Sequence, residues 1–132
     1  MATSTTQPPK TAEPGPADPP DIATMRESAY ILLGPDDGPD VLPPPPAEVD
    51  TLTATLRGHL ELLTPEVELA AGRLHKNSIP RYCALACVGE ARGKLRATPG
   101  PGAAGAAAYA RRLARVLRAL CDHHETLTGV TL

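Results

Sequence analysis

The chain has no tryptophan and no phenylalanine, and only three of its 132 residues are tyrosine. Proteins that bind single-stranded nucleic acid stack the bases on aromatic side chains, so this scarcity argues against such a surface. The hydrophobic core must therefore consist of Leu, Val, Ile and Ala, and each fully buried Leu contributes about 1.5–3 kcal/mol. In a chain this small such a core is modest, and a partner or self-association would add to its stability.

Long apolar runs are also missing. No stretch approaches the roughly 18 apolar residues that a membrane helix needs, and we expect no membrane association. The first residues, Met1–Thr6, lack both the positive charge and the apolar core of a secretory signal. The three cysteines are an odd number, which fits free thiols better than a set of disulfides. Together these features predict a cytoplasmic protein.

Motifs of the common enzyme classes are absent as well. The sequence contains no phosphate-binding glycine loop, no dinucleotide-binding glycine pattern, no Ser-His-Asp order and no pair of carboxylates in a plausible cleft. We therefore assign no catalytic residue, expect no cofactor and favour a protein that is not an enzyme.

The residues that are present change in character at Pro43–Pro46. Before this boundary lies a proline-rich arm with a net charge of −5, and the rest of the chain carries +3. Residues 1–20 bury too little apolar surface to fold and are predicted to be a disordered tail. Residues 34–46 are predicted to be an extended, proline-rich linker.

One segment within the arm, residues 21–33, is predicted to form a short amphipathic helix. Asp21 is a good N-cap, and Gly34 followed by Pro35 is a typical stop. A helix this short is marginal alone in water, so it has to dock. Three alternatives stay open: it packs on its own bundle, it enters a groove of a partner protein, or it forms no stable helix. The apolar side chains available for the contact are Ile22, Met25, Ala29 and Leu32.

Residues 47–132 are predicted to form an all-α, antiparallel bundle of three to four helices. The first main helix begins near Ala47, the second covers residues 80–97 and the last covers residues 103–127. Short connections make sequential neighbours antiparallel. The first of these helices has one continuous apolar face, formed by Val49, Leu52, Leu56, Leu60, Leu63, Val67, Ala70 and Leu74.

Pro65 interrupts this apolar face. Thr64-Pro65-Glu66 is typical of a helix start, with an N-cap residue, a proline in the first turn and an acid at the positive end. The unbroken apolar spacing on both sides of Pro65 instead favours one kinked helix. We therefore expect a kinked helix or a stepped pair along one side of the bundle.

Cysteine and histidine side chains form the sharpest candidate for a metal site. Within each of two predicted helices they are spaced three or four residues apart, on one helix face, and zinc is bound tetrahedrally by these residue types. The competing interpretation, which we favour, is that buried free cysteines act as small hydrophobic residues, so no metal is assigned. The candidate ligands are His75, Cys83, Cys87, Cys121 and His124.

The last predicted helix turns Tyr109, Leu113 and Leu117 inward and carries a basic face on its other side. Such a face could bind phosphate or nucleic acid, but the net charge of +3 on the bundle is far below that of typical nucleic-acid binders. We favour a solvated face that is supported by a pair between Arg118 and Asp122. The basic face consists of Arg111, Arg112, Arg115 and Arg118.

Several short stretches of the bundle form a recognisable pattern: Leu56-Arg57-Gly58-His59-Leu60, Leu63-Thr64-Pro65-Glu66-Val67-Glu68, Cys87-Val88-Gly89-Glu90-Ala91-Arg92, Arg112-Leu113-Ala114-Arg115 and Ala119-Leu120-Cys121-Asp122-His123-His124-Glu125. Over residues 47–127 the pattern resembles a small actinobacterial family of unknown function, domain-of-unknown-function family 6415. The resemblance implies an association with natural-product biosynthesis but no activity, and it transfers no site residue. His124 stands where the family has a tyrosine-like position.

Three hypotheses about function follow. The favoured one is a non-catalytic accessory or protein-interaction module that binds a protein partner or a second copy of the chain. The alternative is a protein of secondary metabolism that binds a metal or a small molecule, and a cavity lined by Tyr82, Cys83, Cys121 and His124 would favour it. A nucleic-acid-binding regulator is the least favoured of the three.

Overall fold

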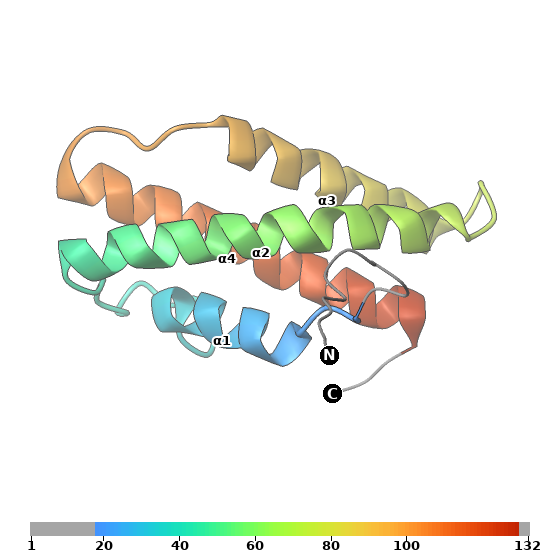
Figure 1. Ribbon diagram of the computed structural model, residues 1–132, viewed down its shortest axis with the longest axis horizontal. Coiled ribbons are helices and arrows are strands. Elements are labelled where there is room, and N and C mark those ends of the chain that lie inside the picture. The colour runs from blue at the N-terminus through green and yellow to red at the C-terminus, as the bar shows by residue number, and fades with distance from the viewer. Residues whose placement is uncertain (1–17, 130–132) are drawn as a thin grey trace, which may run out of the picture.

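The computed structural model describes residues 18–129, which fold into four helices and no strand. The helices are α1 (Ile22–Leu33), α2 (Pro46–Gly72), α3 (Ile79–Arg96) and α4 (Gly102–Thr128). They alternate in direction along the chain, so that α2 and α4 run one way and α1 and α3 the other (Figure 1). The predicted all-α bundle is confirmed, and the number of helices is four because α1 is one of them.

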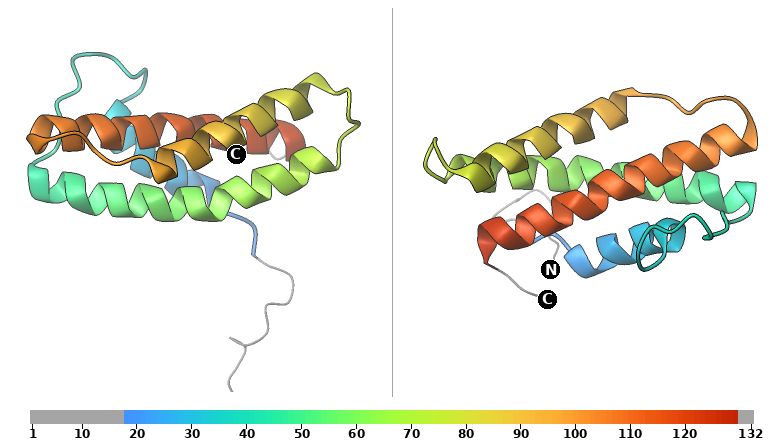
Figure 2. Two further views of the ribbon diagram at one scale, coloured as in Figure 1. Left: turned by 90° about the horizontal axis from the view of Figure 1, so that it is seen from above. Right: turned by 180° about the vertical axis from the view of Figure 1, so that it is seen from behind.

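The pairing of α2 with α4 forms the centre of the bundle. Helix α1 packs mainly on α4 and touches α2 lightly, whereas α3 packs on both central helices from the other side (Figures 1 and 2). No contact joins α1 to α3 in the part of the chain that the structure describes. Leucines fill the space between the central helices, and the fully buried ones are Leu56, Leu60, Leu63, Leu113, Leu117 and Leu120.

Helix α2 is 27 residues long and continues through Pro65 without a break, so the interpretation as one helix is confirmed. It changes direction partway along its length (Figure 2, left), as a proline inside a helix requires. Thr64 is therefore not an N-cap: its side chain is buried, and its hydroxyl has no hydrogen-bond partner among the described residues. Leu74, expected on the apolar face, lies beyond the end of α2 and is half-buried, because the helix stops at Gly72.

Helix α1 begins as predicted, with the Asp21 carboxylate accepting hydrogen bonds from the Thr24 amide at 3.1 Å and the Thr24 hydroxyl at 2.8 Å. The four side chains expected to dock lie in the chain's own core, which is the first of the three alternatives. None is more than 5% exposed, so none is available to a partner while α1 stays in place: Ile22, Met25, Ala29 and Leu32.

Residues 1–17 and 130–132 lie outside the described part, and so does most of the predicted disordered tail. Among the described helices, none combines the length and the apolar character of a membrane span.

Candidate functional site

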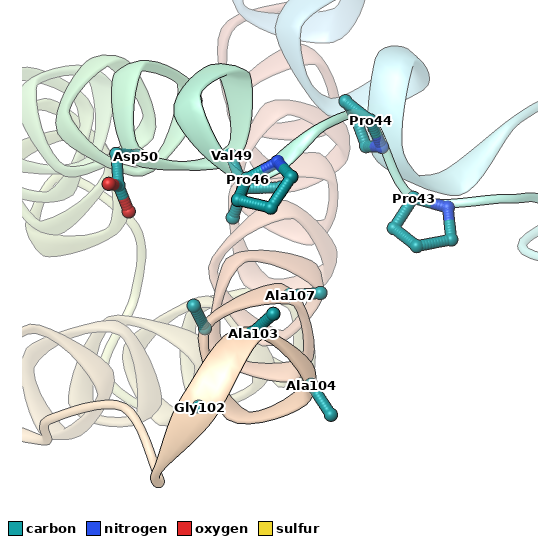
Figure 3. A pocket seen from close by; sticks show the side chains of 10 residues that line it. Pro43, Pro44, Pro46, Val49, Asp50, Gly102, Ala103, Ala104 and Ala107 are labelled. Atoms are coloured by element: carbon teal, nitrogen blue, oxygen red, sulfur yellow. The ribbon is translucent and has the colours of Figure 1, made fainter.

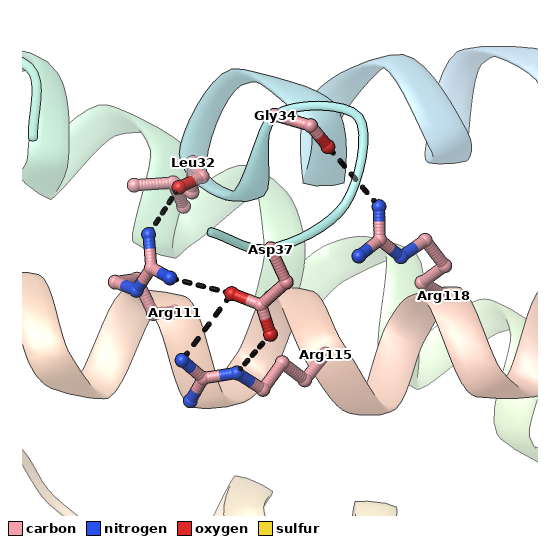
Figure 4. Close-up of polar contacts among 6 residues, drawn as sticks. All are labelled: Leu32, Gly34, Asp37, Arg111, Arg115 and Arg118. Atoms are coloured by element: carbon pink, nitrogen blue, oxygen red, sulfur yellow. Dashed lines mark hydrogen bonds and ion pairs between the residues drawn. The ribbon is translucent and has the colours of Figure 1, made fainter. Parts of the chain in front are cut away.

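Three arginines of α4, Arg111, Arg115 and Arg118, point toward the end of α1 and the connection between α1 and α2 (Figure 4). Arg111 Nη2 donates to one carboxylate oxygen of Asp37 at 2.5 Å, and Arg115 Nε donates to the other at 2.7 Å. The hydrogen bond from Arg115 is the main cause that lowers the pKa of Asp37. Asp37 has a φ of 54°, and it is the one non-glycine residue with a positive φ within residues 18–129.

Two main-chain carbonyls at the end of α1 complete this group of contacts. Arg111 Nη1 donates to the carbonyl of Leu32 at 2.6 Å, and Arg118 Nη1 donates to that of Gly34 at 3.2 Å (Figure 4). The last carbonyls of a helix have no partner within the helix and favour a cation beside them. We call Arg111, Arg115 and Arg118 the arginine clamp, because they hold the C-terminal end of α1 and Asp37 on α4.

The clamp changes the interpretation of the basic face. Three of its four arginines contact the chain itself, and Arg112 lies over the ring of Tyr109, 5.9 Å from the centroid. The expected pair between Arg118 and Asp122 is not formed, since Arg118 reaches Gly34 instead. Asp122 pairs with Arg26 of α1 at 2.9 Å, and Arg26 also reaches Glu125 at 2.8 Å.

The cysteines and histidines are not brought together as a ligand set. Within the described residues, no group of three or more His, Cys, Asp or Glu side chains could hold a metal ion. Cys83 is exposed, whereas burial raises the pKa of both the Cys87 and the Cys121 thiol to about 11. His75 Nδ1 accepts from the amide of Asn77 at 3.1 Å. His124 Nδ1 is buried without a partner among residues 18–129.

A cavity of about 520 Å³ lies where the linker meets the first turns of α2 and α4 (Figure 3). Its wall is mainly proline and alanine, and Asp50 is the one ionisable side chain in it. Both helices start without a side-chain cap. The lining residues include Pro43, Pro46, Val49, Ala103, Ala104 and Ala107.

Gly105 shapes the start of α4 beside this cavity. A Cβ atom added to it would lie 2.3 Å from the carbonyl carbon and oxygen of Gly100. The connection from α3 therefore rests directly on the backbone of the first turn of α4. Only a residue without a side chain permits that contact.

A groove of about 450 Å³ separates the N-terminal end of α1 from α2. On its floor His59 Nε2 lies 3.2 Å from Ser28 Oγ, and that hydroxyl donates to the carbonyl of Thr24. The single hydroxyl proton is thereby used, so His59 Nε2 is the donor to Ser28. Burial lowers the pKa of His59, and nearby Asp21 opposes the shift. Asp18, Asp21 and Glu66 place carboxylates around the groove.

The end of the bundle where α2 passes into α3 is basic and partly apolar. Residues 69–89 contain three arginine or lysine residues and no acid. Ile79 is 74% exposed and Tyr82 is 75% exposed. Arg81 donates through Nη1 to the carbonyls of Ala71, Gly72 and Leu74 at 3.3–3.4 Å, and so caps α2. We call Arg73, His75, Lys76, Ile79 and Tyr82 the α2–α3 tip.

The comparisons with known proteins add a family and no activity. The model of a family of unknown function, DUF6415, matches residues 23–129, which includes all of α2, α3 and α4 and nearly all of α1. No curated protein and no solved structure matches the chain.

Proposed function

The chain belongs to this family of unknown function, and from its geometry we propose that it is a non-catalytic accessory module that binds a protein partner. The observation that carries the proposal is the α2–α3 tip, where two large apolar side chains stand exposed among positive charges. Arg73 and Lys76 form no ion pair within the described residues. The partner that fits is an acidic segment with apolar side chains, because buried apolar anchors supply affinity and charges at the rim supply complementarity.

The small number of positive charges at the α2–α3 tip favours a protein partner over a membrane surface or DNA. Basic clusters that hold anionic lipid carry about four to eight Lys or Arg residues. Sequence-independent DNA binding commonly uses about six to ten phosphate contacts. The tip and its neighbour Arg81 provide three such residues, and Arg81 is already engaged with carbonyls.

The association with natural-product biosynthesis, which only the resemblance of the sequence implies, suggests where to look for the partner. We propose that it is a protein of such a process in the producing cell. Cells that make this chain are therefore the appropriate setting for the test.

Site-specific photocrosslinking tests the proposal. A benzophenone amino acid placed at Tyr82 of the full chain should crosslink a protein segment rich in Asp, Glu and apolar residues, identified by mass spectrometry. Leu42, which is 84% exposed and lies in the linker, is the matched control position. Lys76→Glu should reduce the crosslink at residue 82 severalfold, because it puts a like charge against the acidic segment.

Three outcomes would overturn the proposal. They are equal crosslinking from positions 82 and 42, a crosslinked segment without acidic residues, and a yield that is unaffected by Lys76→Glu. The charge reversal lies in an exposed connection, so its effect on folding should be small, and circular dichroism checks this.

The cavity at the start of α2 and α4 supports a second candidate, the binding of a small apolar molecule. Its volume of about 520 Å³ falls in the range of about 300–1,000 Å³ usual for ligand sites. The fluorescent probe 1-anilinonaphthalene-8-sulfonate should bind in this cavity. The Ala103→Trp variant should not bind it, because the indole fills the cavity from its exposed rim. Fluorescence that is unchanged by Ala103→Trp would reject this candidate.

A further inference from the structure

We propose that two copies of this chain pair through the outer face of α2, with the two α2 helices antiparallel and crossing near Pro65. This surface shares Arg73 with the α2–α3 tip but uses neither Ile79 nor Tyr82, and the inference does not depend on the proposed partner. It rests on a line of apolar and small residues, on the charges at its two ends and on their order along the helix.

The apolar line lies on the side of α2 that faces away from the core. Its members are spaced four, three, four and three residues apart, which keeps them on one helix face. Leu62 is 66% exposed and Leu69 is 57% exposed. We call Gly58, Leu62, Pro65, Leu69 and Gly72 the outer stripe of α2.

The two glycines leave the backbone open at the ends of the outer stripe. Apart from neighbouring residues in the chain and the backbone of α2 itself, no atom lies within 4 Å of a Cβ position built on Gly58 or on Gly72. Small residues at these spacings allow a second helix to approach closely, so that the leucines between them can reach across the contact. Exposed leucines are ordinary when single, but a contiguous apolar line is a feature of interfaces.

The charges beside the outer stripe are separated along α2. The groove next to Leu62 has the carboxylates of Asp18 and Asp21 on its lip. The hollow next to Leu69 is lined by Glu66, Glu68 and Arg73. Glu68 is paired with Arg92 at 2.7 Å, so Arg73 is the cation left beside Leu69. Neither Asp18 nor Arg73 forms an ion pair in the part of the chain described. The face thus has the carboxylates of Asp18 and Asp21 beside one end and the unpaired Arg73 beside the other.

This order of charges selects the occupant and its direction. A second copy in the antiparallel direction brings its Leu69 against Leu62 and its Arg73 beside the acidic lip. The same contact forms twice, as in a twofold-symmetric interface. A parallel copy would instead place like charges together, which disfavours that arrangement. The surface is therefore complementary to itself.

Glu66, which lines both the groove and the hollow, opposes this pairing. It lies next to Pro65, so in a twofold contact centred there the two copies of Glu66 come close to each other. Removing this charge should therefore strengthen the dimer. If the exposed leucines did not lie in such a contact, removing it would not change the dimer affinity.

Sedimentation velocity of the full chain over a wide concentration range tests the proposal. A contact of one helix with one helix is at the small end of specific interfaces, so we expect a reversible dimer with a Kd of about 1–100 μM. Leu69→Asp should raise the Kd at least tenfold, which corresponds to about 1.4 kcal/mol. Leu42→Asp, at a more exposed position off the outer stripe, is the matched control and should leave the Kd unchanged.

Reversal of the charges at Asp18 and Arg73 is the decisive part of the experiment. Asp18→Lys and Arg73→Glu should each weaken the dimer, and the chain that carries both changes should recover it, because the acidic and basic ends are then exchanged in both copies. Glu66→Gln should lower the Kd. The proposal would be overturned by a chain that stays monomeric at about 500 μM or by a Kd that Leu69→Asp does not change. It would also be overturned if the free-energy losses of Asp18→Lys and Arg73→Glu simply added in the chain that carries both changes.

Discussion

Arg57 of α2 and Tyr109 of α4 are joined by a hydrogen bond of 2.5 Å from the guanidinium Nη1 to the phenol oxygen. The same guanidinium donates to the carbonyl of Leu95, and the phenol donates to the carbonyl of Lys94, both at 2.9 Å. These two carbonyls belong to the last turn of α3, where a cation is favourable, and the Lys94 carbonyl also accepts from the amide of Ala97 at 3.2 Å. One polar contact thereby ties together α2, α3 and α4.

Tyr109→Phe removes only the hydroxyl at the centre of this contact. Tyr109 is 2% exposed, and the change removes one of the two partners of both the Lys94 carbonyl and the Arg57 guanidinium, leaving the Ala97 amide and the Leu95 carbonyl. We expect the free energy of unfolding to fall by about 1–3 kcal/mol, as measured by urea denaturation. Tyr82→Phe, at a tyrosine that is 75% exposed, is the control and should change it little. Equal effects of the two changes would contradict this account.

The sequence predicted the position of Tyr109 but not its role. Helical spacing placed its ring in the core, and the structure confirms this. Its partner Arg57 sits between Leu56 and Leu60 of the apolar face, where spacing indicates a boundary residue and nothing more. The acceptors are main-chain carbonyls of another helix, and a pattern of side chains along one helix carries no information about them.

The arginine clamp makes stability depend on pH through Asp37. The Arg115 hydrogen bond and the nearby arginines lower the pKa of Asp37 in the folded state. A lowered carboxyl pKa contributes stability above the unfolded-state value, about 3.9, and that stability is lost as the pH falls through the folded-state value. Asp37→Asn should therefore lower the free energy of unfolding at pH 7. The difference in the free energy of unfolding between this variant and the unchanged chain should shrink below about pH 4.

Urea denaturation of both chains between about pH 7 and pH 2.5 measures this difference. Asp40→Asn is the control, because Asp40 is exposed and forms no ion pair within the described residues. If the Asp37 difference persisted unchanged at the lowest pH, the carboxylate charge would not be its source.

The clamp also shows where the prediction from sequence stopped. The spacing of Arg111, Arg115 and Arg118 correctly placed them on one helix face. Their partners depend on how Gly34–Asp37 turns, with positive φ at both Gly34 and Asp37. This turn directly follows the docked end of α1, and that docking was itself one of three open alternatives. A basic helix face is therefore compatible with solvent, an anion or the chain itself until the neighbouring segment is placed.

Thiol reactivity should separate the three cysteines. Cys83 is exposed, whereas burial raises the pKa of Cys87 and Cys121 to about 11. At pH 8 a thiol with that pKa is ionised in about one molecule in a thousand, and burial also restricts access. Iodoacetamide followed by intact-mass measurement should show one rapid modification, and two more after unfolding. Cys83→Ser should abolish the rapid one, and a second rapid site in the folded chain would contradict the burial of the other two.

Replacement by alanine should lower the stability of the protein at Gly105 and raise it at Gly89. Alanine normally gains about 0.5–1 kcal/mol over glycine within a helix. At Gly89, on the exposed side of α3, nothing lies within 4 Å of the added Cβ, so Gly89→Ala should stabilise the protein by about that amount.

At Gly105 the added Cβ would meet the backbone of Gly100 at 2.3 Å, and backbone atoms cannot rotate away as the end of a side chain can. Overpacking of this kind costs about 1–3 kcal/mol, which exceeds the gain in helix propensity, so Gly105→Ala should be destabilising. Urea denaturation of the two variants side by side measures the difference, and the pair controls for the propensity itself. Equal stabilisation by both changes would mean that the connection from α3 does not rest on α4 in solution, and that the wall of the cavity beside it is not fixed.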